Sequence, residues 1–163
     1  MSFAWISNLT NNLGIGAQMD KTTTLSIYTD GGSRGNPGPS AFGVHIENQS
    51  GLTLDEIGQN LGTTTNNVAE YSAIVAGLSW VVKNKSKMPG LTRINFFMDS
   101  QLASSQLNGF YKIKNTQLRE LLFSAKEKEA EIDLPVHYSH IPREQNKKAD
   151  RMVNLALDNR LKE

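Results

Sequence analysis

Apolar and polar positions alternate along the first third of the chain, from residue 25 onward. Over residues 25–29 (LSIYT) the alternation has a period of two in residues that favour β-structure. This pattern is typical of a strand, which should end on Asp30 because a run of glycine and proline follows. Two more strands are expected over 41–48 and 52–61. Short turns join all three strands, so they should form an antiparallel meander.

The rest of the chain has the longer period of amphipathic helices, interrupted by two short segments that we predict to be strands. Apolar residues recur every three or four positions and give each long helix one buried stripe. The expected helices run from a cap within 63–67 to about residue 85, over 100–108, over 116–131, and from 145 or 146 to 161. The expected strands are 93–98 and 136–140. Strands and helices in this order predict an α/β domain.

In residues 1–24, apolar residues are interleaved with Asn, Thr, Gly and Ser, unlike in the segments that follow. We treat this stretch as an N-terminal extension. The apolar spacing over 5–13 fits one or two amphipathic helical turns. A loosely ordered tail, a strap over the domain and a docking peptide all remain open. We expect a flexible or loosely packed extension, followed by a folded domain over 25–163.

Composition narrows the class of protein. A chain of 163 residues fits one domain with a real hydrophobic core. Its formal net charge of +1 excludes the overall field of a strongly basic nucleic-acid binder, although a local basic face remains open. No stretch approaches the roughly 18 uninterrupted apolar residues of a membrane span, and the first residues lack the features of a signal peptide. We therefore expect a cytoplasmic protein with no membrane partner.

Four acidic residues stand at the ends of predicted elements, two after strands and two in the first turns of helices: Asp30, Asp99, Glu70 and Asp150. Each has an ordinary structural explanation. Asp30 would accept turn hydrogen bonds, and Asp150 would favour the dipole of its helix. Asp99 would cap a helix, and Glu70 would complete a capping box with Asn67. Strand ends and helix starts nevertheless meet along one edge of an α/β sheet.

Four carboxylates gathered at one edge would repel one another strongly unless cations neutralised them. The chain has no cysteine, so thiolate metal sites and disulfides are excluded and any metal would be held by carboxylate or imidazole. Oxygen-only ligands suit Mg²⁺ or Mn²⁺. Two such ions about 3.5–4 Å apart form the clamp used for in-line phosphodiester displacement. A two-metal site is therefore one hypothesis, beside four separate structural explanations.

Four ordered motifs resemble those of type 1 ribonuclease H. They are TDGGSRGNPGP, TNNVAEYSAIVAGL, MDSQL, and HIPREQNKKAD followed by RMVNLAL. Each motif holds one of the four acidic residues, and together they cover the chain from about Leu25 to its end. The resemblance implies the ribonuclease H-like fold, in which α-helices flank both faces of a five-stranded mixed β-sheet, with a catalytic domain over 25–163.

The resemblance also implies an endonuclease that cuts the RNA strand of an RNA/DNA hybrid and leaves 5′-phosphate and 3′-hydroxyl ends. Its cofactors would be two Mg²⁺ ions, for which Mn²⁺ can substitute. At the matching positions, Asp30 would bridge both metals and Asp150 would help to hold the ion that activates water. Glu70 and Asp99 would hold the ion at the leaving oxygen. The implied task is removal of primer and R-loop RNA, and we expect a monomer.

Polar residues near the carboxylates match the family's substrate contacts. Four amide side chains would bind minor-groove base edges and 2′-hydroxyls without demanding one sequence: Asn36, Asn66, Asn67 and Gln101. Thr65 matches a residue that contacts a DNA-strand phosphate. Capping and turn chemistry would explain the same residues, and for Asn66 and Thr65 both roles can hold at once.

His140 lies ten residues before Asp150, at the position of a flexible-loop histidine that assists turnover and product release in many members of the family. The alternative is a solvent-facing histidine at a strand end, because relatives with a PRE loop, as at 142–144 here, vary at this point. His45 and His137 are expected to be structural.

Two departures from the family pattern bear on substrate binding. The segment Phe110–Asn115 is short, with Lys112 and Lys114 as its basic residues, and so resembles the branch that lacks a basic protrusion. Residues 1–24 lack the size and the basic and aromatic density of the hybrid-binding module found in some relatives. Affinity for the hybrid should therefore be modest and sensitive to salt.

Four alternatives to hybrid cleavage are considered from the sequence. The same fold could act on RNA–DNA junctions or RNA duplexes, work beside a reverse transcriptase, or serve as a non-catalytic hybrid-binding module. The binding module is disfavoured because all four carboxylates are present. A transposase or integrase on this fold is disfavoured by the glycine-rich loop and by the helix that begins with TNN and carries Glu70.

Overall fold

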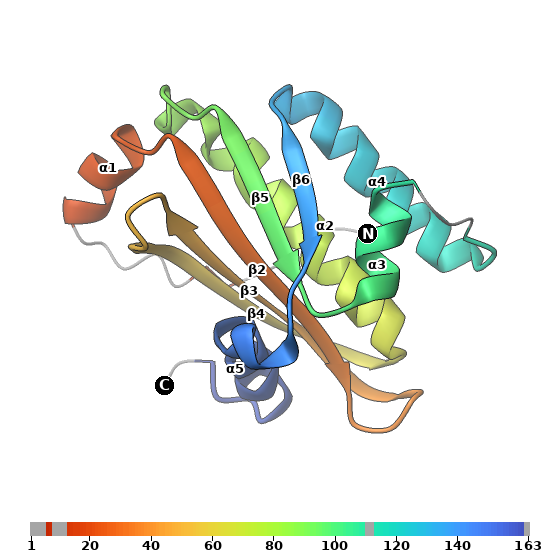
Figure 1. Ribbon diagram of the computed structural model, residues 1–163. Coiled ribbons are helices and arrows are strands. Elements are labelled where there is room, and N and C mark those ends of the chain that lie inside the picture. The colour runs from red at the N-terminus through yellow and green to blue at the C-terminus, as the bar shows by residue number, and fades with distance from the viewer. Residues whose placement is uncertain (1–5, 8–12, 110–112, 162–163) are drawn as a thin grey trace.

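A mixed β-sheet runs through the centre of the structure (Figure 1). The computed structural model describes residues 6–7, 13–109 and 113–161. The strands are β1 (Ile6–Ser7), β2 (Thr24–Ser33), β3 (Gly38–Asn48), β4 (Thr53–Thr64), β5 (Arg93–Met98) and β6 (Val136–His140). The helices are α1 (Leu13–Asp20), α2 (Asn66–Asn84), α3 (Gln101–Leu107), α4 (Thr116–Ile132) and α5 (Lys147–Leu157), with 3₁₀ turns at Lys85–Lys87 and Arg143–Gln145.

The strand order across the sheet is β1-β4-β3-β2-β5-β6. Strands β2, β3 and β4 form the predicted antiparallel meander, and β5 and β6 extend the sheet from β2 in parallel. The five expected strands therefore pair as a mixed sheet, and the expected fold class is confirmed. The two-residue β1 adds an edge strand that the sequence did not predict, with Ile6 opposite Gly58 of β4.

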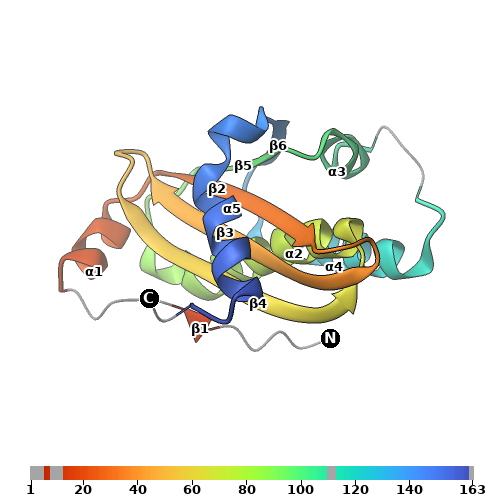
Figure 2. The same ribbon diagram turned by 90° about the horizontal axis from the view of Figure 1, so that it is seen from below.

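Helices cover both faces of the sheet (Figures 1 and 2). Helices α2 and α4 lie on one face, and α5 crosses the other face over β3. The largest fully buried side chains of the main core are Trp80, Tyr71, Phe42 and Phe96. The smaller core, under α5, holds Ala41, Val153 and Ala156. Within the described ranges, no helix is long and apolar enough to cross a membrane.

Part of the N-terminal extension packs against the domain. Helix α1 begins at Leu13, and most of the stretch 5–13, where helical turns were expected, lies outside the described residues. Met19 of α1 is 3% exposed and belongs to the main core. Thr22 is fully buried, and its hydroxyl donates to the Gln18 carbonyl at 2.7 Å. The end of the extension therefore contributes to the core.

Strand β2 continues past Asp30, although the sequence pattern predicted that it would end there. Gly31 and Gly32 still pair with β3, and the turn comes only after Ser33. The reason is a close approach between two elements. A Cβ on Gly31 would lie 2.2 Å from the backbone nitrogen of Glu70 in α2. The glycine that the sequence presented as a turn signal is thus required where the strand meets a helix backbone.

The last helix also ends earlier than expected, at Leu157 rather than 161. Asn159 adopts a left-handed conformation (φ 56°), which is a common way for a chain to leave a helix. Leu161 nevertheless packs against the smaller core. Leu161 is therefore still partly buried, as an apolar helix residue would be, although it lies outside the helix.

A charged cluster holds α5 on the sheet. His45 of β3 is 2% exposed. Its Nδ1 lies 2.9 Å from a Glu56 oxygen, and its Nε2 lies 2.9 Å from a Glu47 oxygen. From α5, Lys148 bonds to Glu47, and Arg151 lies 3.7 Å from Glu56. His45 thus has the structural position expected of it, and the cluster helps to set where the first turns of α5 lie.

We expect Gly31→Ala to destabilise the fold, because the added methyl group would overlap the α2 backbone. Overpacking of this kind costs about 1–3 kcal/mol or more, and it should lower the urea midpoint of unfolding. Gly16→Ala in α1 is the matched control, since no atom lies within 4 Å of its added Cβ. The control should be neutral or more stable by up to about 1 kcal/mol. Equal midpoints for Gly31→Ala and the unmodified chain would contradict the close approach.

Candidate active site

Four elements each bring one carboxylate to a single open cavity of about 610 Å³. The four are Asp30 on β2, Asp99 after β5, Glu70 on α2 and Asp150 on α5. Strands β2 and β5 are parallel, and their last paired residues are Thr29 and Met98. The next residue of each strand is an aspartate, so Asp30 and Asp99 are neighbours at the same edge. The structure therefore brings together the four acidic residues that the sequence singled out.

Glu70 has no capping role in α2. The N-cap is Thr65 rather than Asn67, because the Thr65 Oγ1 accepts a hydrogen bond from the Val68 N–H at 3.3 Å. A capping box would place its acidic partner three residues after the cap, whereas Glu70 comes five residues after Thr65. The side chain of Glu70 lines the cavity instead.

Ser100 takes the capping role that the sequence allowed for Asp99. Its hydroxyl oxygen accepts from the Ala103 N–H at 3.1 Å at the start of α3. The same hydroxyl forms a hydrogen bond to Glu70 that opposes the rise in the pKa of that carboxyl. Ser100 therefore fixes the start of α3 and the position of Glu70 together, while Asp99 faces the cavity.

Burial and mutual repulsion perturb these acids. Burial, together with the charges of Asp99 and Asp150, raises the pKa of Asp30 to about 8. Burial also raises the pKa of Glu70 to about 7. The pKa of Asp99 is raised by burial as well, although the nearby Arg143 guanidinium opposes that rise. The site thus carries an excess of negative charge that a bound cation would relieve.

The donor set suits a hard divalent cation. All four side chains offer carboxylate oxygens, the ligands that Mg²⁺ and Mn²⁺ prefer. Among the described residues, no group of three or more acidic or histidine side chains is arranged so that it could already hold an ion. The chemistry of the donors and their excess charge therefore fit a divalent metal, and the carboxylates would close around it on binding.

Four of the five polar residues expected to bind substrate gather at the start of α2. Asn66 and Asn67 line the cavity. Asn36 lies in the turn after β2, and its Oδ1 accepts from the Asn66 N–H at 3.1 Å. Thr65 is the helix cap. Gln101 stands apart as the exposed first residue of α3, next to the cavity-lining Ser100.

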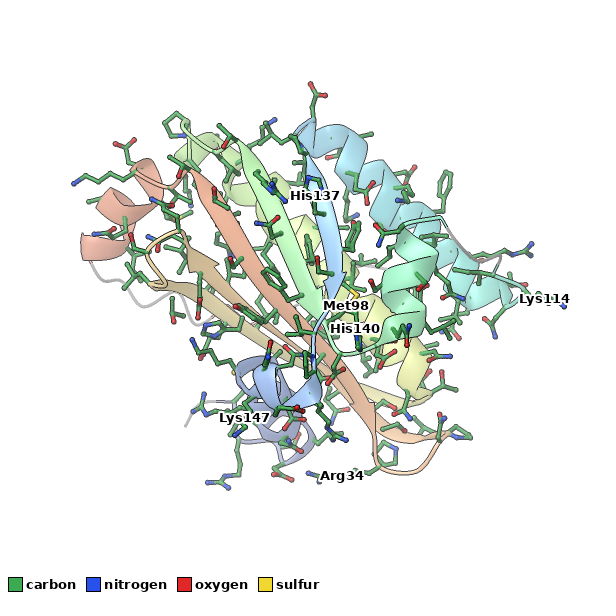
Figure 3. All side chains as sticks on the ribbon, in the orientation of Figure 1. Arg34, Met98, Lys114, His137, His140 and Lys147 are labelled. Carbon is green, nitrogen blue, oxygen red and sulfur yellow. The ribbon has the colours of Figure 1, made fainter. Side chains whose placement is uncertain are left out.

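His140 is the exposed last residue of β6, opposite Met98 in β5 (Figure 3). As far as the chain is described, the cavity lining does not include it. His137, on the same strand, is also exposed. A role for His140 in turnover stays a prediction.

The cavity also holds basic residues that the sequence analysis did not assign to the site. Arg143 lines it, and its charge opposes the rise in the pKa of Asp99. Arg34 lines it from the turn after β2 (Figure 3). Arg34 forms an ion pair with Asp158 at 2.8 Å. Their sequence signal is weak, because each is one basic residue in a loop, although both stand inside motifs that carry an acidic site residue.

The segment proposed to replace the basic protrusion lies only partly within the described residues. Phe110–Lys112 are outside them. Helix α3 ends at Leu107 and α4 begins at Thr116, so the connection is short, as the sequence indicated.

Comparison with known proteins agrees with this geometry. Residues 28–156 match a family model described as reverse transcriptase-like. A ribonuclease HI of Halobacterium salinarum is 36% identical over 141 residues, which are 86% of this chain and 68% of that protein. A bifunctional protein of Mycobacterium tuberculosis is 39% identical over 133 residues, which are 81% of this chain. The match spans only 35% of the mycobacterial protein's length.

Solved structures of these and other relatives have the same fold. An RNase H1 named LC11, in complex with an RNA/DNA hybrid, matches with a TM-score of 0.77 and 40% identity, covering 84% of this chain and 99% of that one. The RNase H1 of Halobacterium salinarum matches with a TM-score of 0.75 and 36% identity, covering 83% and 98%. The N-terminal RNase H domain of the mycobacterial protein matches with a TM-score of 0.75 and 37% identity, covering 83% and 100%.

We expect Asp30→Asn to stabilise the protein in the presence of a chelator. The substitution keeps the shape of the side chain and removes one of four repelling charges. A gain on the order of 1 kcal/mol would raise the Tm by about 2–4 °C. A carboxyl whose folded pKa is raised destabilises the fold when ionised, so the gain should be complete above about pH 8 and absent below about pH 3.8.

Calorimetric melting of both proteins at several pH values in EDTA would measure this gain, and added Mg²⁺ should reduce it. A lower Tm for Asp30→Asn at pH 8 would show that the four carboxylates do not repel one another as the structure indicates.

Proposed function

Because this chain belongs to the type 1 ribonuclease H family, we propose that it is an endoribonuclease that hydrolyses the RNA strand of RNA/DNA hybrids and leaves 5′-phosphate and 3′-hydroxyl ends. One observation carries the proposal: four carboxylates from four separate elements share one open cavity. The hybrid bound to LC11-RNase H1, a protein 40% identical to this chain, supports the same substrate. Removal of primer and R-loop RNA in the cytoplasm by a monomer is the task proposed for it.

The family depends on divalent metal, and we propose that two Mg²⁺ ions bind here, with Mn²⁺ able to substitute. Asp30 would be shared between the ions, with Asp150 on one and Glu70 and Asp99 on the other. Bound there, the ions would supply an activated water and would neutralise charge at the leaving oxygen. The protein's own contribution is to bring the four carboxylates to one cavity, where they can close around the ions.

Polar residues at the start of α2 would orient the hybrid. The Thr65 oxygen accepts from the Val68 N–H, so its hydroxyl proton remains able to donate to a phosphate oxygen. Asn36 uses its Oδ1 to bond the Asn66 N–H, which leaves its NH₂ group for a base edge or a 2′-hydroxyl. Asn67 and Gln101 would add further amide contacts. These neutral groups would bind minor-groove base edges and 2′-hydroxyls without demanding one sequence.

Charge at the cavity would help to receive the RNA strand. Arg143 lines the cavity opposite Asp99 and provides a guanidinium that fits a phosphate group. Glu70 is proposed to sense the ribose 2′-hydroxyl through the metal site, which is one way to distinguish RNA from DNA. With few basic residues at the α3–α4 connection, affinity for the hybrid should be modest and sensitive to salt.

Cleavage of a 5′-labelled RNA/DNA hybrid tests the proposal, with RNA/RNA, DNA/DNA, RNA–DNA junction and single-stranded substrates beside it. Each substrate would be incubated with Mg²⁺, with Mn²⁺ and with EDTA. We expect metal-dependent cutting of the RNA strand of the hybrid alone. Hybrid binding without any cutting would instead mean a binding module, and cutting of junctions or RNA duplexes would assign a different substrate.

We expect Asp30→Asn to abolish cleavage, a fall of at least about a hundredfold, while circular dichroism and hybrid binding stay intact. Asp133→Asn is the matched control. Asp133 is an exposed residue in a left-handed conformation after α4, which Asn also tolerates, so this variant should keep its activity. Mg²⁺-dependent cleavage retained by Asp30→Asn would refute the two-metal assignment.

His140→Ala should slow turnover several-fold if His140 assists product release. Because release follows chemistry, the single-turnover rate should change much less than the steady-state kcat. His137→Ala is the control, since this histidine is exposed on the same strand. Equal steady-state rates for both variants and the unmodified enzyme would exclude a role for His140.

A further inference from the structure

A single buried amide lies among the catalytic carboxylates. Asn146 is 0% exposed and stands directly before the first residue of α5. The sequence presents it only as one possible start of that helix, and it provides no side-chain cap there. Its burial therefore has no explanation in helix capping.

The contacts of Asn146 reach three of the four acid-bearing elements. Its Nδ2 donates to the Thr29 carbonyl at 2.9 Å, one residue before Asp30 on β2. Burial raises the pKa of Asp99 at the end of β5, and hydrogen bonding from the Asn146 side chain opposes that rise. Its backbone carbonyl accepts from the Asp150 N–H at 3.1 Å in the first turn of α5.

The orientation of this amide is fixed by what surrounds it. The Thr29 carbonyl oxygen faces the NH₂ group at 2.9 Å, so the reversed amide would place a carbonyl oxygen against it. The Asn146 Oδ1 is buried too, and no donor in the described part of the chain reaches it. A buried acceptor without a partner opposes folding. Stability alone therefore does not explain an asparagine here.

We infer that Asn146 is a positioning residue, which ties the strand before Asp30 to the Asp99 carboxylate and the first turn of α5, so that the carboxylates are spaced to receive divalent metal. The inference rests on the proposed function, because metal-dependent cleavage is what the spacing serves. Ser100 has the corresponding position for Glu70, through a hydroxyl bonded to both that carboxylate and the start of α3.

Two substitutions of Asn146 distinguish a positioning role of this residue from a packing role. Asn146→Asp keeps the volume and shape of the side chain but replaces the NH₂ donor by an oxygen facing Thr29 and Asp99. Asn146→Ala loses the volume but leaves room for a water molecule that can donate to the same two oxygens. If Asn146 only fills space, Asn146→Asp should reduce activity less than Asn146→Ala. If Asn146 positions the carboxylates, Asn146→Ala should reduce activity less than Asn146→Asp.

Steady-state cleavage of an RNA/DNA hybrid by Asn146→Ala and Asn146→Asp tests this order. We expect kcat to fall about 10–100-fold for Asn146→Ala and further for Asn146→Asp, with KM for the hybrid within about twofold of the unmodified value. Asn84→Ala is the matched control, because Asn84 is also buried and its amide also donates to a backbone carbonyl, that of Trp80, far from the cavity. Its Tm should fall while its kcat stays unchanged.

Isothermal titration calorimetry with Mg²⁺ alone and with Mn²⁺ alone gives a second readout that does not depend on cleavage. Affinity for the ion should weaken about 10–100-fold in both Asn146 variants and stay unchanged in Asn84→Ala. If the unmodified protein binds metal but cuts no hybrid, the proposed function fails and the calorimetry still decides the role of Asn146.

Two results would overturn the inference. One is a kcat and a metal affinity that are unchanged in both Asn146 variants at a temperature where they are folded. The other is an Asn146→Asp variant that keeps more activity than Asn146→Ala, since this order is the one that packing alone would produce.

Discussion

Repulsion among four carboxylates at one edge of the sheet is the constraint that the rest of the structure has to satisfy. In the unfolded chain these groups are solvated and far apart, whereas folding buries them together and raises the pKa of Asp30 to about 8. Native proteins are stable by only about 5–15 kcal/mol, so packing elsewhere must outweigh this unfavourable charge. The main core between the sheet and α2, with Trp80 and Tyr71 fully buried, is the largest source of that packing.

The sheet brings two helices to the same point through two glycines. Asp30 lies opposite Gly43 of β3 in the antiparallel register. A Cβ on Gly43 would lie 2.3 Å from the Ala149 carbonyl of α5, beside Asp150, and one on Gly31 would meet the α2 backbone at Glu70. Both helices can therefore approach the strands closely enough to bring their carboxylates into the cavity that contains Asp30 and Asp99.

Neutral side chains beside the four carboxylates, and a charged cluster outside the cavity, hold the carboxylates together against their mutual repulsion. Ser100 hydrogen-bonds Glu70, and Asn146 donates to Asp99 while bonding the strand that carries Asp30. Neither residue adds negative charge to the cavity. Outside the cavity lining, the cluster centred on His45 holds α5 on the sheet through the ion pairs Lys148–Glu47 and Arg151–Glu56. Residues other than the four carboxylates therefore hold these carboxylates in position.

The amino-acid sequence by itself determined the elements and the identity of the acids. Periodicity indicated the five long strands and the principal helices, and four motifs carried Asp30, Glu70, Asp99 and Asp150. Local patterns failed where one residue had two possible roles. The glycines after Asp30 read as a turn although β2 continues through them, and Asn67 read as the cap that Thr65 provides.

Only the tertiary structure decided which other residues lie around the four acids. Arg143, in the 3₁₀ turn before α5, lines the same cavity as Asp99, and its charge opposes the rise in the pKa of that carboxyl. Asn146 bonds a carbonyl 117 positions away in the chain, on Thr29. A local pattern carries information about neighbours within a turn or a strand pair, and a hydrogen bond across the whole chain exists only once the sheet has formed. The four acidic residues could therefore be identified from the sequence, whereas the contacts that position them could not.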